Sequence, residues 1–151
     1  MSEHPIQLRW QRSTTDFDLK SYNRSHAVTF KNGQSLSMSA AVSYRGDAEM
    51  VDPEEAFVAS LASCHMLTFL AVAAGRKFTV DRYEDDAVGF LERLEGGRMA
   101  ITRVVLRPRI AFSGDQPDET ALHEMHEKAH EACFIANSVT TKVTVEQPAA
   151  V

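Results

Sequence analysis

Alternating apolar and polar positions in the first third of the chain predict short β-strands. Residues 6–10 alternate in this way, as expected for a strand with one buried face. Two further runs, 26–30 and 34–38, flank the dipeptide Asn32–Gly33, which is a strong signal for a tight hairpin turn. We therefore expect residues 1–51 to form a β-hairpin region.

The pattern then changes to a long apolar segment that predicts a central helix over about residues 53–74. Asp52 is a typical N-cap, and Pro53 suits the first helical position. Residues 56–74 are almost all apolar or small, and Gly75 marks the end. Such a helix is about 30 Å long. Because it is apolar nearly all round, we expect it to be buried at the centre of the protein.

The remainder alternates between strand and helix patterns. It predicts a long hairpin over 78–112 with a turn at Gly96–Gly97, a second helix over about 118–133, a last strand over 139–146 and a frayed tail. The predicted fold class is α+β, with antiparallel β-sheets around a long buried central helix. We expect a single domain over residues 1–151.

Composition narrows the function classes. The formal net charge of −5 argues against nucleic acid as a partner, because phosphate binding needs a basic surface. Polar residues interrupt the apolar helix, so no membrane span is expected, and the first ten residues lack the apolar stretch of a signal peptide. A cytoplasmic location follows as an expectation. The two cysteines are then either packed thiols or a redox pair.

One motif suggests a metal hydrolase. The segment His126-Glu127-Lys128-Ala129-His130 fits the H-E-x-x-H pattern of helical zinc enzymes, in which two histidines share a helix face. A catalytic zinc needs a third ligand, and no histidine follows His130. We therefore interpret His123 and His126 as a solvated helix face, with His130 on the side of Cys133.

Cys64 lies in the middle of the apolar helix, where a thiol often does no more than pack. Burial at such a place raises a thiol's pKa, whereas a useful nucleophile must be a thiolate. A redox role for Cys64 therefore needs a cation close by, and an arginine from elsewhere in the chain is the natural candidate.

Two segments carry a resemblance to a known family. Residues 52–65 resemble the helix signature of the OsmC/Ohr proteins (osmotically inducible and organic hydroperoxide resistance proteins), and residues 129–138 resemble that family's second-cysteine segment. The element order is also similar, so the resemblance covers most of the chain. The glycine-rich arginine loop of the family is absent, which places the sequence nearer the OsmC-like branch.

The resemblance implies a two-cysteine thiol peroxidase that acts on organic hydroperoxides, with hydrogen peroxide as a second candidate. Cys64 matches the peroxidatic cysteine, Cys133 the resolving cysteine and Glu54 the acidic partner. Arg24 is the best match to the essential arginine, and Arg45 is the alternative. The family also implies an intertwined homodimer, an external dithiol reductant such as a lipoyl group, and no metal or flavin.

Helix geometry constrains the implied site. Ten residues of helix place Glu54 and Cys64 about 15 Å apart along the axis, farther than one arginine spans. Either the helix is broken between them, or Arg24 and Glu54 come from the partner subunit. Two further hypotheses remain beside the zinc hydrolase: a non-catalytic protein with packed thiols, and a thiol sensor without sustained turnover.

Overall fold

The computed structural model describes residues 1–146 and divides the chain into two compact units. The first covers Met1–Ala56 and the second starts at Phe57, so the boundary falls within the first turn of the central helix. The single domain expected from the sequence stays a prediction.

The first unit is a three-stranded antiparallel sheet in the order β1-β2-β3. The strands β1 (Ile6–Arg9), β2 (His26–Phe30) and β3 (Ser35–Met38) confirm the predicted strands to within one residue. Gly33, with a φ of 83°, makes the β2–β3 turn at the predicted place, because a left-handed backbone favours glycine. A short 3-10 helix, η1 (Val42–Tyr44), precedes the central helix.

The central helix α1 (Pro53–Gly75) begins with a capping box. The Asp52 carboxylate accepts the Glu55 N–H at 2.7 Å, and the Glu55 carboxylate accepts the Asp52 N–H at 3.0 Å. At the other end the left-handed residue is Lys77, with a φ of 66°, and not Gly75. Phe78 N–H then bonds to the Ala73 carbonyl and closes the helix. The predicted helix is confirmed, and it is unbroken.

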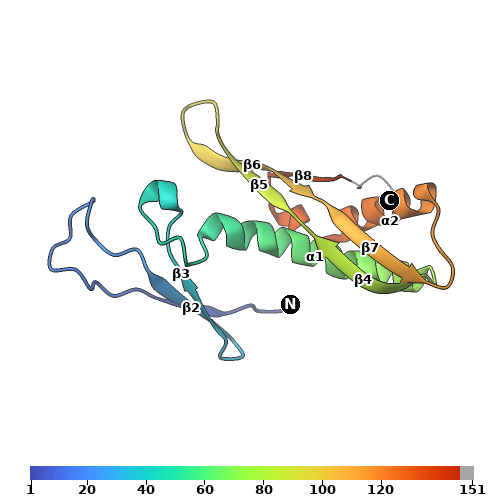
Figure 1. The fold of residues 1–151 in the computed structure, drawn as a ribbon, viewed down its shortest axis with the longest axis horizontal. Helices are drawn as coiled ribbons and strands as arrows, with labels where there is room; N and C mark the ends of the chain where they lie inside the picture. Colours follow the sequence, from blue (N-terminus) through green and yellow to red (C-terminus); the bar gives the residue numbers. More distant parts are fainter. Residues whose placement is uncertain (147–151) are drawn as a thin grey trace. The chain divides into compact units, whose positions relative to one another are not determined.

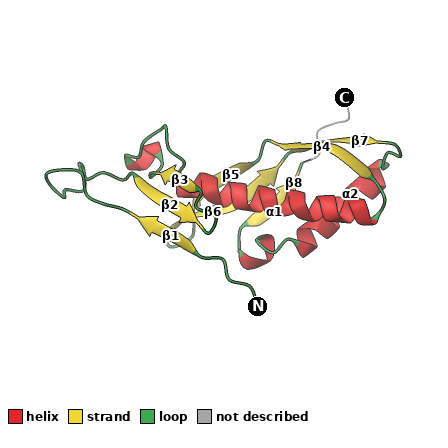
Figure 2. Cartoon of the chain, turned by 90° about the horizontal axis from the view of Figure 1, so that it is seen from below, coloured by secondary structure: helices red, strands yellow, loops and turns green. Residues whose placement is uncertain are grey.

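The second unit places two helices on one side of two small sheets (Figures 1 and 2). One sheet pairs β4 with β7, and the other has the order β5-β6-β8, with β8 parallel to β6. The elements are β4 (Thr79–Asp85), β5 (Val88–Arg93), β6 (Met99–Leu106), β7 (Pro108–Ser113), α2 (Glu119–Ala132), η2 (Ala136–Ser138) and β8 (Lys142–Val145).

The long hairpin predicted over 78–112 is therefore corrected in one respect. Each of its two arms is interrupted. The half near the glycine turn (β5 and β6) therefore belongs to a different sheet from the half far from the turn (β4 and β7). At the interruption the Asp85 carboxylate accepts the Arg107 N–H at 2.6 Å, which replaces a backbone ladder bond. The predicted second helix and last strand are present, and the tail at 147–151 lies outside the described residues.

Two apolar clusters hold the second unit together. Phe69 and Ala73 of α1 pack with Met125 and Ala129 of α2, and Leu61 packs with Val104 and Leu106 of β6. The buried residues of α1 are thus Leu61, His65, Phe69 and Ala73, at a spacing of four, which makes one stripe and not a helix buried all round. Residues on another side of α1 are exposed in the single chain, and we call them the outer stripe: Ser60, Ser63, Leu67, Ala71 and Ala74.

Candidate active site

The two cysteines of the chain meet in the second unit. Cys64 lies midway along α1 and is partly buried, whereas Cys133 is the C-cap of α2 and is 1% exposed. Both thiols are free, and each influences the pKa of the other. The structure thus brings together the pair that the family resemblance implied, although they are 69 residues apart in the sequence (133 − 64).

The end of α2 explains why Cys133 faces α1. Cys133 leaves the helix with an extended backbone, and the chain turns directly into η2. Asn137 fixes this turn twice: its backbone N–H donates to the Cys133 carbonyl at 3.0 Å, and its side-chain amide donates to the Glu131 carbonyl at 2.9 Å. Ala136 N–H points at the Cys133 sulfur, with N and Sγ 3.4 Å apart. The second cysteine is therefore held by a rigid turn.

The two thiols differ in acidity. Burial acts to raise the pKa of Cys64, but hydrogen bonds from Cys133, from the backbone of Ile135 and Phe134, and from Thr68 together lower it below the ordinary thiol value. Burial raises the pKa of Cys133, and its hydrogen bond to Cys64 raises it further. Cys64 is thus the sulfur that ionises first, with Cys133 as a thiol donor beside it. These neutral donors were missed by the sequence analysis, which looked only for a cation.

A second pair, of histidines, lies on the neighbouring face of α1. His65 Nε2 and His126 Nδ1 are 3.0 Å apart, and the two rings are nearly parallel. His65 is 1% exposed and His126 is 4% exposed. Burial lowers the pKa of each to about 4, so both rings are neutral at pH 7. His65 Nδ1 has no hydrogen-bond partner within residues 1–146.

The predicted solvated position of His126 is therefore wrong. The signal that could have placed it is helical periodicity: it shares a face of α2 with Leu122, Met125 and Ala129, which are all core residues. The ring also packs against Phe69, with ring centroids 4.5 Å apart. His123, in contrast, is exposed as predicted.

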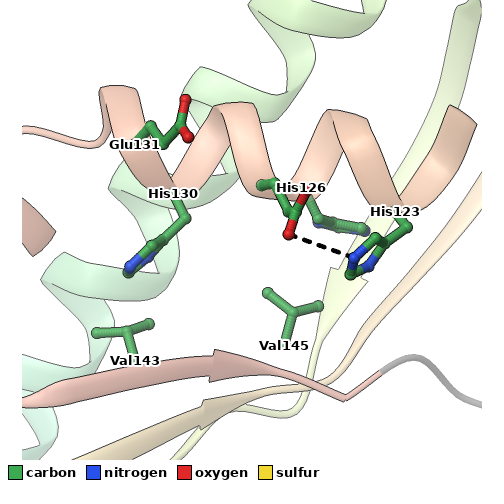
Figure 3. A pocket seen from close by; sticks show the side chains of 7 residues that line it. His123, His126, His130, Glu131, Val143 and Val145 are labelled. Atoms are coloured by element: carbon green, nitrogen blue, oxygen red, sulfur yellow. Dashed lines mark ion pairs between the residues drawn. The ribbon is translucent and has the colours of Figure 1, made fainter.

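The H-E-x-x-H segment does not assemble a zinc site. His126 is hydrogen-bonded to His65, while Glu127 pairs with His123 at 3.3 Å. His123, His126 and His130 line a hollow of about 270 Å³ above Val143 and Val145 of β8, and Glu131 points away from that strand (Figure 3). Within residues 1–146, no group of three or more His, Cys, Asp or Glu is placed to hold a metal ion.

The other predicted site residues belong to the first unit. Arg24 lies just before β2, where its guanidinium covers the Tyr22 ring and donates to the carbonyls of Tyr22 and Leu19 at 2.8 and 2.7 Å. Glu54 lies in the first turn of α1. In the part of the chain that the structure describes, neither residue forms an ion pair. Arg45, the alternative, is exposed at the end of η1.

An apolar hollow of about 370 Å³ lies beside Arg24 in the first unit. Its walls include three aromatic rings, those of Trp10, Phe17 and Tyr22, whose centroids are 5.2–6.5 Å apart. Trp10 Nε1 donates to the Asn23 carbonyl at 2.8 Å and so ties β1 to the loop that carries Arg24. The loop before β2 is thus an ordered structure built on aromatic packing.

The sequence around this thiol pair matches a known protein family. Residues 46–147, about two thirds of the chain, match the family model described as OsmC-like protein. The chain belongs to the OsmC-like family. The matched segment includes both cysteines and Glu54, whereas Arg24 lies before it.

Individual relatives agree with this assignment. An OsmC-like protein of unknown function from Vibrio cholerae is 44% identical, with a TM-score of 0.93 over 98% of this chain and all of the other. The uncharacterized protein YmaD of Bacillus subtilis is 22% identical over 132 residues, which cover 85% of this chain and 87% of YmaD. The organic hydroperoxide resistance protein OhrB of Bacillus subtilis is 19% identical, with a TM-score of 0.67 over 97% of this chain and 98% of OhrB, and shares the fold.

Family membership also explains the apolar central helix. α1 is long and apolar enough to cross a membrane by length and composition alone. It is a core helix of the OsmC-like α+β fold, which packs through its buried stripe onto α2 and β6, and no membrane is implied.

Proposed function

We propose that this OsmC-like protein is a two-cysteine thiol peroxidase that reduces organic hydroperoxides. The observation that carries the proposal is the juxtaposition of Cys64 and Cys133, in which the pKa of Cys64 is lowered and that of Cys133 is raised. A thiolate beside a thiol is the arrangement needed for attack followed by resolution. Neighbours of the same fold that are named organic hydroperoxide resistance proteins give the substrate class.

The reaction consumes one peroxide and one dithiol. The Cys64 thiolate attacks the distal peroxide oxygen, the O–O bond breaks, and the alkoxide leaves and takes up a proton to become an alcohol. Cys64 is then a sulfenic acid. Cys133 condenses with it to form a disulfide and releases water. An external dithiol, with a lipoyl group as the candidate, reduces the disulfide and becomes a disulfide itself. No step needs a metal or a flavin.

A homodimer supplies the cation in this proposal. Because α1 is unbroken from Pro53 to Gly75, Glu54 and Cys64 of one chain are about 15 Å apart along the helix and do not share one arginine. Cys64 borders the outer stripe, whose Leu67 is 60% exposed. We propose that a second copy packs on this stripe and buries it, and that Arg24 of that copy, in an ion pair with Glu54 that the single chain lacks, is the cation for the Cys64 thiolate. Arg45 is the alternative cation.

The hollow beside Arg24 suits the organic part of the substrate. Its aromatic walls favour an apolar group, while Arg24 keeps N–H donors beyond those used on the two carbonyls and can bind peroxide oxygens. This arrangement favours organic hydroperoxides over hydrogen peroxide, which has no apolar part.

The test is mass spectrometry of the reduced protein after one equivalent of cumene hydroperoxide, with peptide mapping. We expect a Cys64–Cys133 disulfide within seconds, reversed by dihydrolipoamide. Cys64→Ser should lower peroxide turnover by at least about a thousandfold, because the nucleophile is lost. Thr120→Ala, at an exposed position of α2, is the control. Cys133→Ser should leave a sulfenic acid on Cys64 that dimedone traps.

Other outcomes separate the remaining hypotheses. Unchanged thiols after peroxide would overturn the peroxidase and favour a packed, non-catalytic pair. A disulfide that forms with peroxide but is not turned over by dihydrolipoamide or another dithiol would favour thiol sensing.

A further inference from the structure

The hollow beside Arg24 lies where the strands of the first unit end. The sheet register pairs His26, the first residue of β2, with Met38, the last residue of β3, and Ser39 follows directly. The β1–β2 register, continued by one residue, brings Trp10 opposite His26. His26, Ser39 and Trp10 all line the hollow. Strand pairing thus brings an imidazole, a hydroxyl and an indole to one place.

The backbone fixes the tautomer of His26. Its Nδ1 lies 2.9 Å from the Arg24 carbonyl oxygen. Because a carbonyl can only accept a hydrogen bond, Nδ1 is the donor and carries the proton of the neutral ring. The other ring nitrogen, Nε2, then has a lone pair and can accept a hydrogen bond from a ligand.

Ser39 and Arg24 supply donors beside this acceptor. Ser39 is 1% exposed, and its hydroxyl accepts the Asp47 N–H at 3.2 Å, so that its own proton is left for another acceptor. Arg24 donates to two carbonyls and has N–H groups beyond those bonds. The rest of the wall is mainly aromatic. The hollow therefore matches an apolar group that carries an O–H.

We propose that His26 is a specificity-determining residue of this hollow, where its Nε2 accepts the O–H of an organic hydroperoxide whose apolar part lies among the aromatic rings. A hydroperoxide has one proton to donate and lone pairs on both oxygens, which suits one acceptor flanked by donors. The product alcohol keeps the apolar group and an O–H. The inference rests on the proposed function for the peroxide itself, and on the hollow alone for ligand binding.

Trp10 allows binding to be followed directly, because it is the single tryptophan of the chain and forms part of the wall. Its fluorescence is titrated with cumyl alcohol, the product of cumene hydroperoxide, and with cumyl methyl ether, which keeps the apolar group but has no O–H. We expect the wild type to bind the alcohol about two- to tenfold more tightly than the ether, the effect of one hydrogen bond.

Variants of His26 test whether the preference depends on this residue. His26→Leu removes the acceptor and should bring the ratio of the two affinities to one or below. His26→Gln supplies an amide oxygen as acceptor and should restore part of the ratio. A merely distorted hollow would weaken both ligands alike and keep the ratio. His123→Leu, at an exposed histidine that does not line the hollow, is the control and should keep the wild-type ratio.

Two results would overturn the inference without recourse to a variant. Equal affinities of the wild type for the alcohol and the ether would show that no acceptor of the hollow uses the O–H. Unchanged Trp10 fluorescence up to the solubility limit of both ligands would show that the hollow does not take this class of compound.

Ligand binding does not depend on the thiols, so the two proposals fail separately. An alcohol preference that His26→Leu abolishes, in a protein whose Cys64 does not react with cumene hydroperoxide, supports the role of His26 and overturns the peroxidase. Rapid oxidation of Cys64 in a protein without an alcohol preference does the reverse.

Discussion

Cys64 and His65 are neighbours in the sequence, yet the structure places them in opposite chemical situations. Each pairs with a residue from the end or the body of α2: Cys64 with Cys133, and His65 with His126. Cys64 is partly buried and borders the exposed outer stripe of α1, whereas His65 belongs to the buried stripe and is 1% exposed. A rotation of about 100° around the helix separates the two.

The pKa of Cys64 and the pKa values of the two histidines are lowered for opposite reasons. Hydrogen-bond donors outweigh burial at Cys64 and favour its charged form. At His65 and His126 burial dominates and favours the neutral form. The thiol pair is thus arranged to carry charge, while the histidine pair is arranged to avoid it. One helical turn can therefore hold a reactive site next to a structural one, provided that the two face different surroundings.

We expect acid to destabilise the folded protein through the histidine pair. The folded pKa of about 4 lies below the unfolded value of 6.5, so the unfolded state binds more protons and stability falls as the pH drops from 6.5 to 4. The loss is on the order of 3 kcal/mol for one histidine. Neighbouring His123 and His130 add to the repulsion when they are charged. Urea unfolding at a series of pH values measures the slope.

A double variant makes this prediction specific. His65→Leu with His126→Leu removes both polar partners at similar volume, which is close to neutral at pH 7. Carboxylates still titrate in this variant, so the difference between its slope and that of the wild type isolates the histidines. Equal slopes for the two proteins would show that the pair is not the acid-sensitive element.

At pH 7, removing one histidine should lower the free energy of unfolding more than removing both. His126→Ala leaves His65 with two buried nitrogens and no partner, and it opens a cavity beside Phe69. We expect a loss of about 2–4 kcal/mol in the free energy of unfolding. His123→Ala, three residues away and exposed, should change it by less than about 0.5 kcal/mol. Cys64 alkylation should remain near the wild-type rate in folded His126→Ala, because the two pairs face different sides of α1.

Much of this fold was predictable because its signals are local. The Asn32–Gly33 turn, the Asp52 capping box and the apolar run of α1 depend on residues close together in the sequence. The break in the long hairpin depends on a bond between Asp85 and Arg107, 22 residues apart, and no local pattern shows it.

The candidate site was predictable only in part. Cys64 and Cys133 were found through family resemblance, and their contact appears only when α2 packs on α1. The backbone donors from Phe134 and Ile135 were missed because a backbone N–H leaves no mark in the sequence. His126 was placed wrongly because residue type was weighed above its position on the apolar face of α2. The roles of Arg24 and Glu54 stay predictions.

The smallest effect should come from the contact between the two thiols. Cys133→Ala removes the S–H donor to Cys64, so the Cys64 thiolate loses one hydrogen bond and its pKa should rise. We expect alkylation of Cys64 at pH 7 to slow by about three- to tenfold. Cys133→Ser retains a donor and should lie between Cys133→Ala and the wild type. Faster alkylation in Cys133→Ala would mean that Cys133 shields Cys64 from the reagent more than it stabilises the thiolate. The thiol pair would then resemble the histidine pair, in which burial favours the neutral form.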